Sequence, residues 1–339
     1  MHRTLSNWEY SILLSEAQVL VGKRVNKIYE LCPRKFRLDF GKHSLIISLA
    51  EYFYITSTPP PTPQNPPSFS MLLRKHLTNK KLFSFEQYSN DRVYILKFSN
   101  GLKLVFEQYA QGNMFLLDEN DIIIHPYSFK PTSKKLYKKA QKFPWPSPKE
   151  FALPSTIDEW DEFKAKYGDV KIGTALSKLS IGKIYVLEAL KQAEADKNQK
   201  VCDISGEKAS KILEIISNMQ KNTSPRVYLS KKTPAEVSLA ELEGFEKQKK
   251  FDLFGKAVEY FAENSLESFS EGEKSARILK LQKRLEEQKK ALEDAEKQIK
   301  ELTHVARWME LHLPEIDEKI VLEKEKKGKT GGKLKIKID

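Results

Sequence analysis

The first 150 residues of the chain mix one helical hydrophobic pattern with a series of alternating ones. Apolar residues recur at helical spacing over residues 8–21, and Gly22 follows them. A second helical pattern runs through Met71, Leu72, Leu73 and Leu77, directly after six prolines in residues 59–67. Alternating runs predict strands at residues 24–30, 36–40, 44–49, 52–56, 81–87, 92–98 and 102–107, with a hairpin over 114–125. We therefore expect an α+β domain over residues 1–150, built on a mixed or antiparallel sheet.

The strand pattern fades after the proline-rich stretch at residues 143–148. Short helical patterns follow, so we predict an all-α helix-hairpin-helix domain over residues 151–270. Two of its helices meet around Ser180, Ile181 and Gly182, and Lys183 opens the second helix. Backbone N–H groups at a helix start can bind a phosphate, which makes Ile181, Gly182 and Lys183 candidates for RNA contact. A plain turn within a small helical bundle explains the same pattern.

A heptad pattern of apolar residues dominates the last part of the chain. Its positions alternate in steps of three and four and are Ile278, Leu281, Leu285, Gln288, Leu292, Ala295, Ile299, Leu302, Ala306, Met309 and Leu313. We predict a coiled-coil helix over residues 271–314, about 60 Å long, that ends where Pro314 interrupts it. Residues 315–339 read as a charged, flexible tail. The helix should therefore pair with a second copy of the chain or with a separate polypeptide.

The charge balance points to a polyanionic partner. The 339 residues carry 58 Lys and Arg against 46 Asp and Glu, a net charge of +12. Between Ser128 and Glu150 there are seven lysines and one acidic residue, so half of the net charge lies there. Lys134, Lys135, Lys138 and Lys139 are candidate RNA contacts, with Tyr137 and Phe143 as stacking surface among them. A solvated loop is the alternative for this stretch.

The sequence gives little support for a metal, a cofactor or a membrane as a partner. Cys32 and Cys202 lie far apart without a neighbouring His or second Cys, so we expect no metal and no cofactor. The N-terminus has no apolar signal region, and no run approaches the roughly 18 apolar residues of a membrane span. We expect a cytoplasmic protein that does not bind membranes.

Several ordered motifs resemble the NFACT family, whose members share the N-terminal domain of fibronectin-binding protein A and include ribosome quality-control factors. The motifs are GKRVNKIY at residues 22–29, PPSFSMLLRKHL at 66–77, FEQ at 85–87, DRV at 91–93, GNMFLLD at 112–118, LSIGKIY at 179–185, FDLF at 251–254 and YF at 260–261. Their order and spacing agree with the family over about residues 1–313. The chain resembles the front portion of the family architecture, without its C-terminal RNA-binding domain.

The resemblance implies a factor that engages tRNA and the obstructed large ribosomal subunit, and that supports rescue by C-terminal tailing of the stalled nascent chain. The Asp-Arg pair that the family uses for tRNA falls on Asp91 and Arg92. A guanidinium can bridge phosphates or stack on a base, and a carboxylate can orient it. From the residues alone, Asn90-Asp91 suits an ordinary β-turn, with Arg92 starting a strand. Arg74, Lys75 and His76, on the polar side of the second helix, are further candidate RNA contacts.

Two other functions compete with this reading. The family's first domain resembles the N-terminal domain of formamidopyrimidine-type DNA glycosylases, which carry a Pro-Glu start for Schiff-base chemistry. Here Met1 is followed by His2-Arg3, so we expect no catalytic site. The second alternative is a basic coiled-coil scaffold that holds RNA nonspecifically.

Overall fold

The computed structural model describes residues 4–63, 65–129, 137–147, 154, 157–179, 181–230 and 233–327. For residues 157, 266–285, 287, 290, 291 and 322–327 it describes the backbone only. The chain forms two compact units, Met1–Glu267 and Ser268–Asp339. The predicted domain boundaries at 150 and 270 stay a prediction.

Two antiparallel sheets form the first part of the chain, as the alternating patterns predict. The first sheet has the order β1-β2-β3-β4, with β1 at Lys27–Cys32, β2 at Lys35–Phe40, β3 at His43–Ser48 and β4 at Tyr52–Thr56. The second has the order β5-β6-β7-β8-β9, with β5 at Leu82–Gln87, β6 at Val93–Phe98, β7 at Lys103–Glu107, β8 at Asn113–Leu117 and β9 at Ile123–Pro126. Each strand follows its neighbour in sequence, because short turns join antiparallel strands.

The two sheets share one core. Phe53 of β4 lies with its ring centre 5.7 Å from that of Phe106 on β7 and 5.1 Å from that of Tyr94 on β6. The alternating sequence of the strands explains how this core forms. In β2, the inward-facing residues are buried and the residues between them are half-exposed; the buried ones are Phe36, Leu38 and Phe40.

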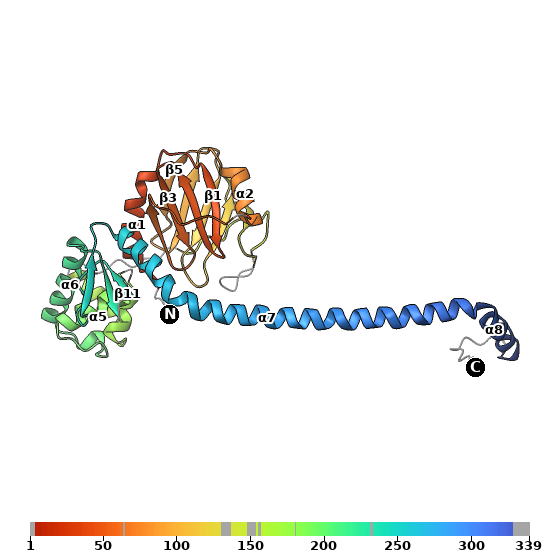
Figure 1. Cartoon of the computed structure of the whole chain (residues 1–339). Coiled ribbons are helices and arrows are strands. Elements are labelled where there is room, and N and C mark those ends of the chain that lie inside the picture. The colour runs from red at the N-terminus through yellow and green to blue at the C-terminus, as the bar shows by residue number, and fades with distance from the viewer. Residues whose placement is uncertain are drawn as a thin grey trace. The chain divides into compact units, whose positions relative to one another are not determined.

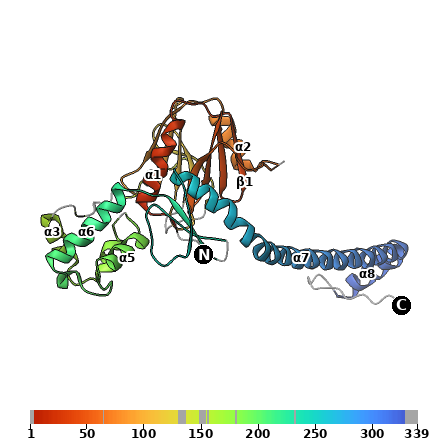
Figure 2. The same ribbon diagram turned by 60° about the vertical axis from the view of Figure 1, so that its left-hand side comes forward.

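Two helices lie along opposite sides of the paired sheets (Figure 1, Figure 2). Helix α1 (Asn7–Ala17), extended by the 3-10 turn η1 (Gln18–Leu20), packs against β4 and β5, while α2 (Ser68–Leu77) packs against β1. A capping box starts α1: Ser6 Oγ accepts from the backbone N–H of Glu9, and the Glu9 carboxylate accepts from the backbone N–H of Ser6.

The middle of the chain is not all helical, which corrects the sequence-based prediction. Its helices are α3 (Ile157–Tyr167), α4 (Ile172–Ser177), α5 (Lys183–Gln192), the 3-10 turn η2 (Val201–Asp203) and α6 (Gly206–Lys221). A three-stranded antiparallel sheet follows, in the order β11-β10-β12, with β10 at Arg226–Ser230, β11 at Thr233–Ser238 and β12 at Lys247–Lys250. The helix-turn-helix of α4 and α5 is confirmed, but the all-α domain is wrong.

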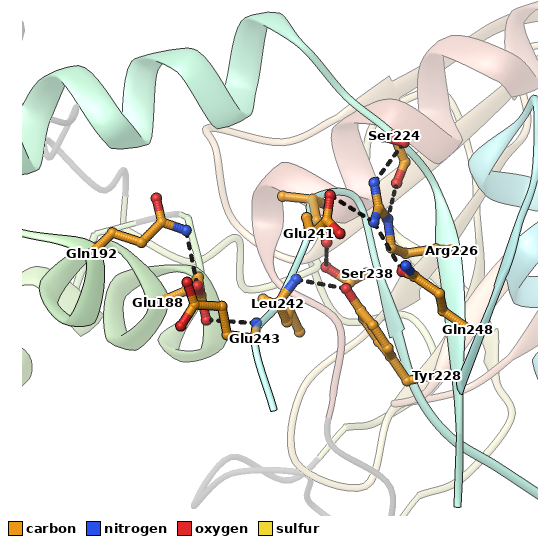
Figure 3. A network of polar contacts seen from close by, with 11 residues as sticks. Glu188, Gln192, Ser224, Arg226, Tyr228, Ser238, Glu241, Leu242, Glu243 and Gln248 are labelled. Atoms are coloured by element: carbon orange, nitrogen blue, oxygen red, sulfur yellow. Dashed lines mark hydrogen bonds and ion pairs between the residues drawn. The ribbon is translucent and has the colours of Figure 1, made fainter. Parts of the chain in front are cut away.

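A buried arginine organises this small sheet (Figure 3). The Arg226 side chain is 3% exposed; it donates to Ser224 and Gln248 and pairs with Glu241 at 3.1 Å. Beside it, the Tyr228 hydroxyl accepts from the backbone N–H of Leu242 at 2.6 Å. The polar groups of the short strands are thus satisfied by side chains as well as by the ladder, as buried polar groups must be.

The long C-terminal helix begins earlier and ends differently than predicted. Helix α7 spans Phe254–Leu311, and α8 spans Leu313–Lys327. Pro314 lies at the start of α8, where its missing N–H costs nothing, so the predicted flexible tail is wrong for residues 315–327. Residues 328–339 lie outside the described part of the chain. Apolar heptad side chains of the described part of α7 are exposed, including Leu292 at 61%, Ile299 at 62% and Leu302 at 67%.

Candidate nucleic-acid interface

The Asp91–Arg92 pair lies in a tight turn between β5 and β6. Ser89 and Asn90 both have positive φ angles, of 43° and 51°. The Asp91 N–H donates to the carbonyl of Tyr88, and the Asp91 carboxylate accepts from the N–H of Arg92 at 2.8 Å. Asp91 is 6% exposed, whereas Arg92 is half-exposed. An ordinary β-turn and an RNA-binding site are therefore compatible interpretations of these residues, because Asp91 closes the turn from which Arg92 extends.

Three residues that bond to this turn or follow it on β6 each carry a buried side-chain atom without a hydrogen bond within the described part of the chain; of the three, Asn7 contacts the turn through its side chain, whereas the side-chain amide of Gln108 donates to the carbonyl of Tyr52 on β4. Among the described residues, the buried side-chain atoms that lack a hydrogen bond include Asn7 Oδ1, Tyr94 OH and Gln108 Oε1. The Asn7 amide donates to the carbonyl of Asn90, the Gln108 N–H donates to the carbonyl of Arg92, and Tyr94 lies within the electrostatic influence of both Asp91 and Arg92. Burial also raises the pKa of Tyr94 well above its usual value, so its hydroxyl stays protonated. Sequence reasoning missed these three residues, since nothing local marks them.

In the described part of the lysine-rich stretch, the Tyr137 side chain reaches the same end of the five-stranded sheet, whereas residues 140–142 lie beside Ile122 and Ile123 toward the other end. Tyr137 OH donates to Glu107 Oε1 at 3.1 Å, and Glu107 pairs in register with Val93, the residue after Arg92. Lys138 and Lys139 are exposed beside Tyr137, while Lys134 and Lys135 lie outside the described residues. Tyr137 and Phe143 are 4% and 2% exposed, so the prediction that they offer stacking surface is wrong. They fill the outer apolar cluster of the sheet against Phe115.

The three candidates on α2 have different environments. The Arg74 Nε donates to the carbonyl of Ile28, and its guanidinium lies 4.7 Å from the ring centre of Tyr29. This side chain therefore fastens α2 to β1, which leaves less of it for RNA. Lys75 is exposed and His76 is half-exposed. Because α2 and α1 lie on opposite sides of the sheets, the structure does not bring these residues to the Asp91 turn.

The α4–α5 turn is fitted against the start of α1. Gly182 has φ +108°, and a Cβ at this position would come within 2.6 Å of Ser6 Cβ, so only glycine fits. One turn later, Tyr185 OH donates to Glu9 Oε1 at 2.7 Å and accepts from the N–H of Leu239 at 2.9 Å. Ile181 is buried and Lys183 is exposed. The conformation of the turn is thus explained by packing, and phosphate contact there stays a prediction.

Glu16 connects α1 to the first turn of α7. Its two carboxylate oxygens accept from the N–H groups of Phe254 and Gly255, each at 2.8 Å. Burial raises the pKa of Glu16, and the two backbone hydrogen bonds partly offset that effect. The N-terminal end of the helix dipole also favours a negative charge at this position, which acts in the same direction as the two hydrogen bonds and against the larger effect of burial.

The described residues contain no group of three or more His, Cys, Asp or Glu placed to hold a metal ion. Within the same residues, no helix is both long and apolar enough to cross a membrane. His2 and Arg3, which bear on the glycosylase alternative, lie outside them.

A comparison with known protein families identifies the family to which the chain belongs. Residues 13–311 match the model for the NFACT N-terminal and middle domains. The chain belongs to this family. The NFACT match includes the sheets, the helical hairpin and the described part of α7, so the resemblance noted from the ordered motifs is confirmed.

Curated NFACT relatives carry ribosome quality-control names. The chain is 32% identical over 333 residues to the archaeal Rqc2 homolog aRqcH of Methanocaldococcus jannaschii, in a match covering 88% of this chain and 49% of that protein. It is 34% identical over 128 residues to ribosome quality control complex subunit 2 of Saccharomyces cerevisiae, covering 35% of this chain and 12% of that protein. The chain thus spans about half the length of the archaeal relative.

A solved structure supports the fold. A fibrinogen-binding protein from Staphylococcus aureus aligns with a TM-score of 0.60 at 16% identity, covering 76% of this chain and 98% of that one. At this identity the likeness shows the α+β fold alone. The expected likeness of the first domain to DNA glycosylases stays a prediction.

Proposed function

We propose that this chain acts in ribosome quality control, where its first domain engages tRNA on an obstructed large ribosomal subunit. The observation that carries the proposal is the 32% identity with the archaeal Rqc2 homolog over 88% of the chain. The turn geometry supports it, because a half-exposed arginine extends from a turn that the Asn7 side chain contacts, and Asn7 Oδ1 is buried without a hydrogen-bond partner among the described residues. Such atoms mark places where a ligand or water completes the hydrogen bonding.

The chemistry assigned to the turn follows from the two side chains. Arg92 would contact tRNA through its planar guanidinium, which can bridge phosphate oxygens or stack on an unpaired base. Asp91 accepts the N–H of Arg92, and its buried charge would orient the arginine from behind. Lys138 and Lys139, which are exposed and follow Tyr137 in the chain, would add phosphate contacts and make binding depend on salt. Support for rescue by C-terminal tailing would follow from holding the tRNA on the subunit.

Binding of tRNA to the whole chain tests the proposal. Arg92→Ala should raise the Kd for tRNA about tenfold or more, since a specific arginine contact contributes roughly 1–3 kcal/mol. Asp91→Asn keeps an oxygen for the Arg92 N–H but removes the negative charge, and should also weaken binding. Lys211→Ala removes one exposed positive charge on α6 and is the matched control. Filter binding at a fixed salt concentration, with thermal melts of each variant, gives the result.

The competing function is a coiled-coil scaffold with nonspecific affinity for RNA. The exposed apolar heptad positions on α7 are the observation that favours it. A nonspecific basic surface binds RNA more tightly when an acid is removed. Unchanged or tighter tRNA binding by Asp91→Asn would therefore support the scaffold and refute the specific site.

Under either function, the exposed apolar heptad positions of α7 require a partner helix. We propose that Leu292, Ile299 and Leu302 pack against a helix of a second copy or of another polypeptide, because an apolar seam of this length is not stable in water by itself. Light scattering of the isolated chain at micromolar concentration should show self-association. Alternatively, co-purification should yield a stoichiometric helical partner. A monomer without such a partner, with α7 still helical by circular dichroism, would contradict the pairing.

A further inference from the structure

A second basic surface lies at the opposite end of the two sheets from Asp91. It is assembled from three segments that are distant in sequence: residues 22–27, residues 39–43 and residues 78–83. Hydrogen bonds hold them together, because the N–H of Val25 donates to the carbonyl of Lys80 and the N–H of Asn26 donates to the carbonyl of Asp39. Arg24 and Lys81 also form an antiparallel bridge. The surface is therefore part of the folded framework rather than a flexible run of charges.

Its charge is almost entirely positive. The three segments contain the cations Lys23, Arg24, Lys27, Lys42, Lys80 and Lys81 and one acid, Asp39. That acid is already paired with Arg37, at 2.6 Å, and accepts from Ser44. The neighbouring imidazole of His43 responds to this environment: burial lowers its pKa, and the charges of Lys23 and Lys42 lower it further. No exposed carboxylate on these segments is left to neutralise the cations.

The β8–β9 turn is the acidic element that approaches this end, through Gly101. Its acids are mostly engaged: Asp121 pairs with Lys103 at 2.6 Å, and Asp118 accepts from the N–H groups of its own turn. Glu119 lies near Gly101. The positive field is therefore centred on the side of Lys81 and Lys42.

An exposed aromatic ring stands beside the cations. Phe83 is 73% exposed, although it lies on β5, an edge strand two residues after Lys81. Leu82 between them is buried, and Phe83 lies at the bulge where the β5–β6 register shifts between Leu82 and Ser84, so Lys81 and Phe83 are both exposed on the same short stretch of the edge strand. A large exposed aromatic on a sheet edge is a liability unless it has a function. An aromatic ring beside several lysines is the arrangement that binds single-stranded nucleic acid, with bases on the ring and phosphates on the cations.

We propose that this basic end, centred on Lys42, Lys81 and Phe83, binds a single-stranded segment of RNA. β5 separates it from the Asp91 turn by about 20 Å, the length of a six-residue strand. The domain would then hold two RNA elements at once, one at each end of its sheets. The inference does not depend on tRNA binding at Arg92, because the two surfaces share no residue.

The test uses a fluorescent oligouridylate of about twelve nucleotides, within the usual site size of such surfaces, and the whole chain carrying Arg92→Ala. In this background, Phe83→Ala should raise the Kd about tenfold, because stacking contributes roughly 1–3 kcal/mol per base. Its matched control is Phe129→Ala, a 47% exposed phenylalanine elsewhere in the first domain. The double variant Lys42→Ala/Lys81→Ala should lower the slope of log K against log salt by about 1.4. Lys211→Ala/Lys221→Ala, with two exposed lysines of α6, is the charge-matched control.

Three results would overturn the proposal. Phe83→Ala could leave the Kd unchanged, or the α6 control could lower the salt slope as much as the test variant. Finally, vesicles containing phosphatidylglycerol could bind through Lys42 and Lys81 while oligouridylate does not, which would make the surface a membrane contact. Failure of tRNA binding at Arg92 with these effects intact would refute the proposed function alone.

Discussion

The hydroxyl of Tyr185 provides the sharpest test of how the middle of the chain is attached to α1. This hydroxyl donates to the Glu9 carboxylate at 2.7 Å and accepts from the N–H of Leu239 at 2.9 Å. Tyr185→Phe removes both hydrogen bonds but keeps the ring, which packs 4.5 Å from the ring centre of Trp8. The variant therefore isolates the polar contacts from the packing.

The expected loss is large for one atom. A hydrogen bond to a carboxylate contributes about 1.5–3 kcal/mol, and a buried N–H left without a partner costs about 1–3 kcal/mol. Because Glu9 keeps its bonds from Ser6, the two effects should sum to the lower part of their combined range, about 2.5–4 kcal/mol. Urea unfolding followed by tryptophan fluorescence, with Trp8 beside the site, measures the change in the free energy of unfolding.

The control is Tyr88→Phe. Tyr88 stacks on Trp145 at 4.5 Å, and its hydroxyl makes no hydrogen bond with any residue that the structure describes. This change should cost less than about 0.5 kcal/mol. Equal destabilisation by the two variants would refute the reasoning, since it would mean that loss of a tyrosine hydroxyl, rather than of these two bonds, was being measured.

Three further predictions concern stability and use the same unfolding assay. Gly182→Ala should lose about 1–3 kcal/mol from strain and a close contact, while Gly206→Ala, with open space around it, should be neutral or slightly stabilising. The raised pKa of Glu16 means that its contribution to stability is present below the unfolded pKa of about 4.5 and is lost as pH rises through the higher folded pKa. Glu16→Gln should therefore reduce the difference in urea midpoint between pH 4 and pH 7, and an unchanged difference would contradict this. Arg226→Met should cost about 1–2 kcal/mol because it removes the hydrogen bonds of a buried guanidinium to Ser224, which is only partly buried, and to the exposed Gln248, whereas Glu241→Ala, at a side chain that is 66% exposed, should cost under about 1 kcal/mol.

The sheets of the first domain were predictable because their strands alternate. β2 shows the period most clearly, with Phe36, Leu38 and Phe40 buried, whereas β3 is an apolar run bounded by turn residues; the β1–β2 turn contains Pro33 and the β2–β3 turn contains Gly41. The three-stranded sheet of β10, β11 and β12 was not predictable because its edge strands lack such a pattern. β12 reads Lys-Gln-Lys-Lys with every residue exposed, and β11 contains Pro234, which only an edge strand accepts. Both become strands because β10 lies between them, which is a tertiary cause.

The first turns of α7 have an apolar pattern at helical spacing that the heptad positions from Ile278 onward do not include. Phe254, Ala257, Val258, Phe261 and Ala262 follow helical spacing and are buried, but they belong to a different face from the later seam. The cap on that helix comes from Glu16, more than two hundred residues earlier, and no local pattern reveals it.

Only part of the candidate site could be predicted from the sequence. Asp91 and Arg92 are adjacent and could be found by motif, whereas Asn7, Tyr94 and Gln108 meet them only through the fold. The second basic surface escaped because charge was judged in continuous windows, and its cations come from three segments. Counting charge in such windows favours the stretch from Lys130 to Lys142, whose Tyr137 proves to be buried, as does Phe143 directly after it.

Helix α1 explains how the candidate site depends on the rest of its unit. Asn7 bonds the Asp91 turn, Glu9 bonds Tyr185, and Glu16, seven residues later and so two turns along the same face, caps α7. A short helix thus fixes the position of the Asp91–Arg92 turn against the helical hairpin and the first turn of α7. A variant that weakens tRNA binding by loosening α1 would therefore also lower stability, whereas Arg92→Ala should weaken binding without doing so. Measuring both quantities on each variant separates the contact from its support.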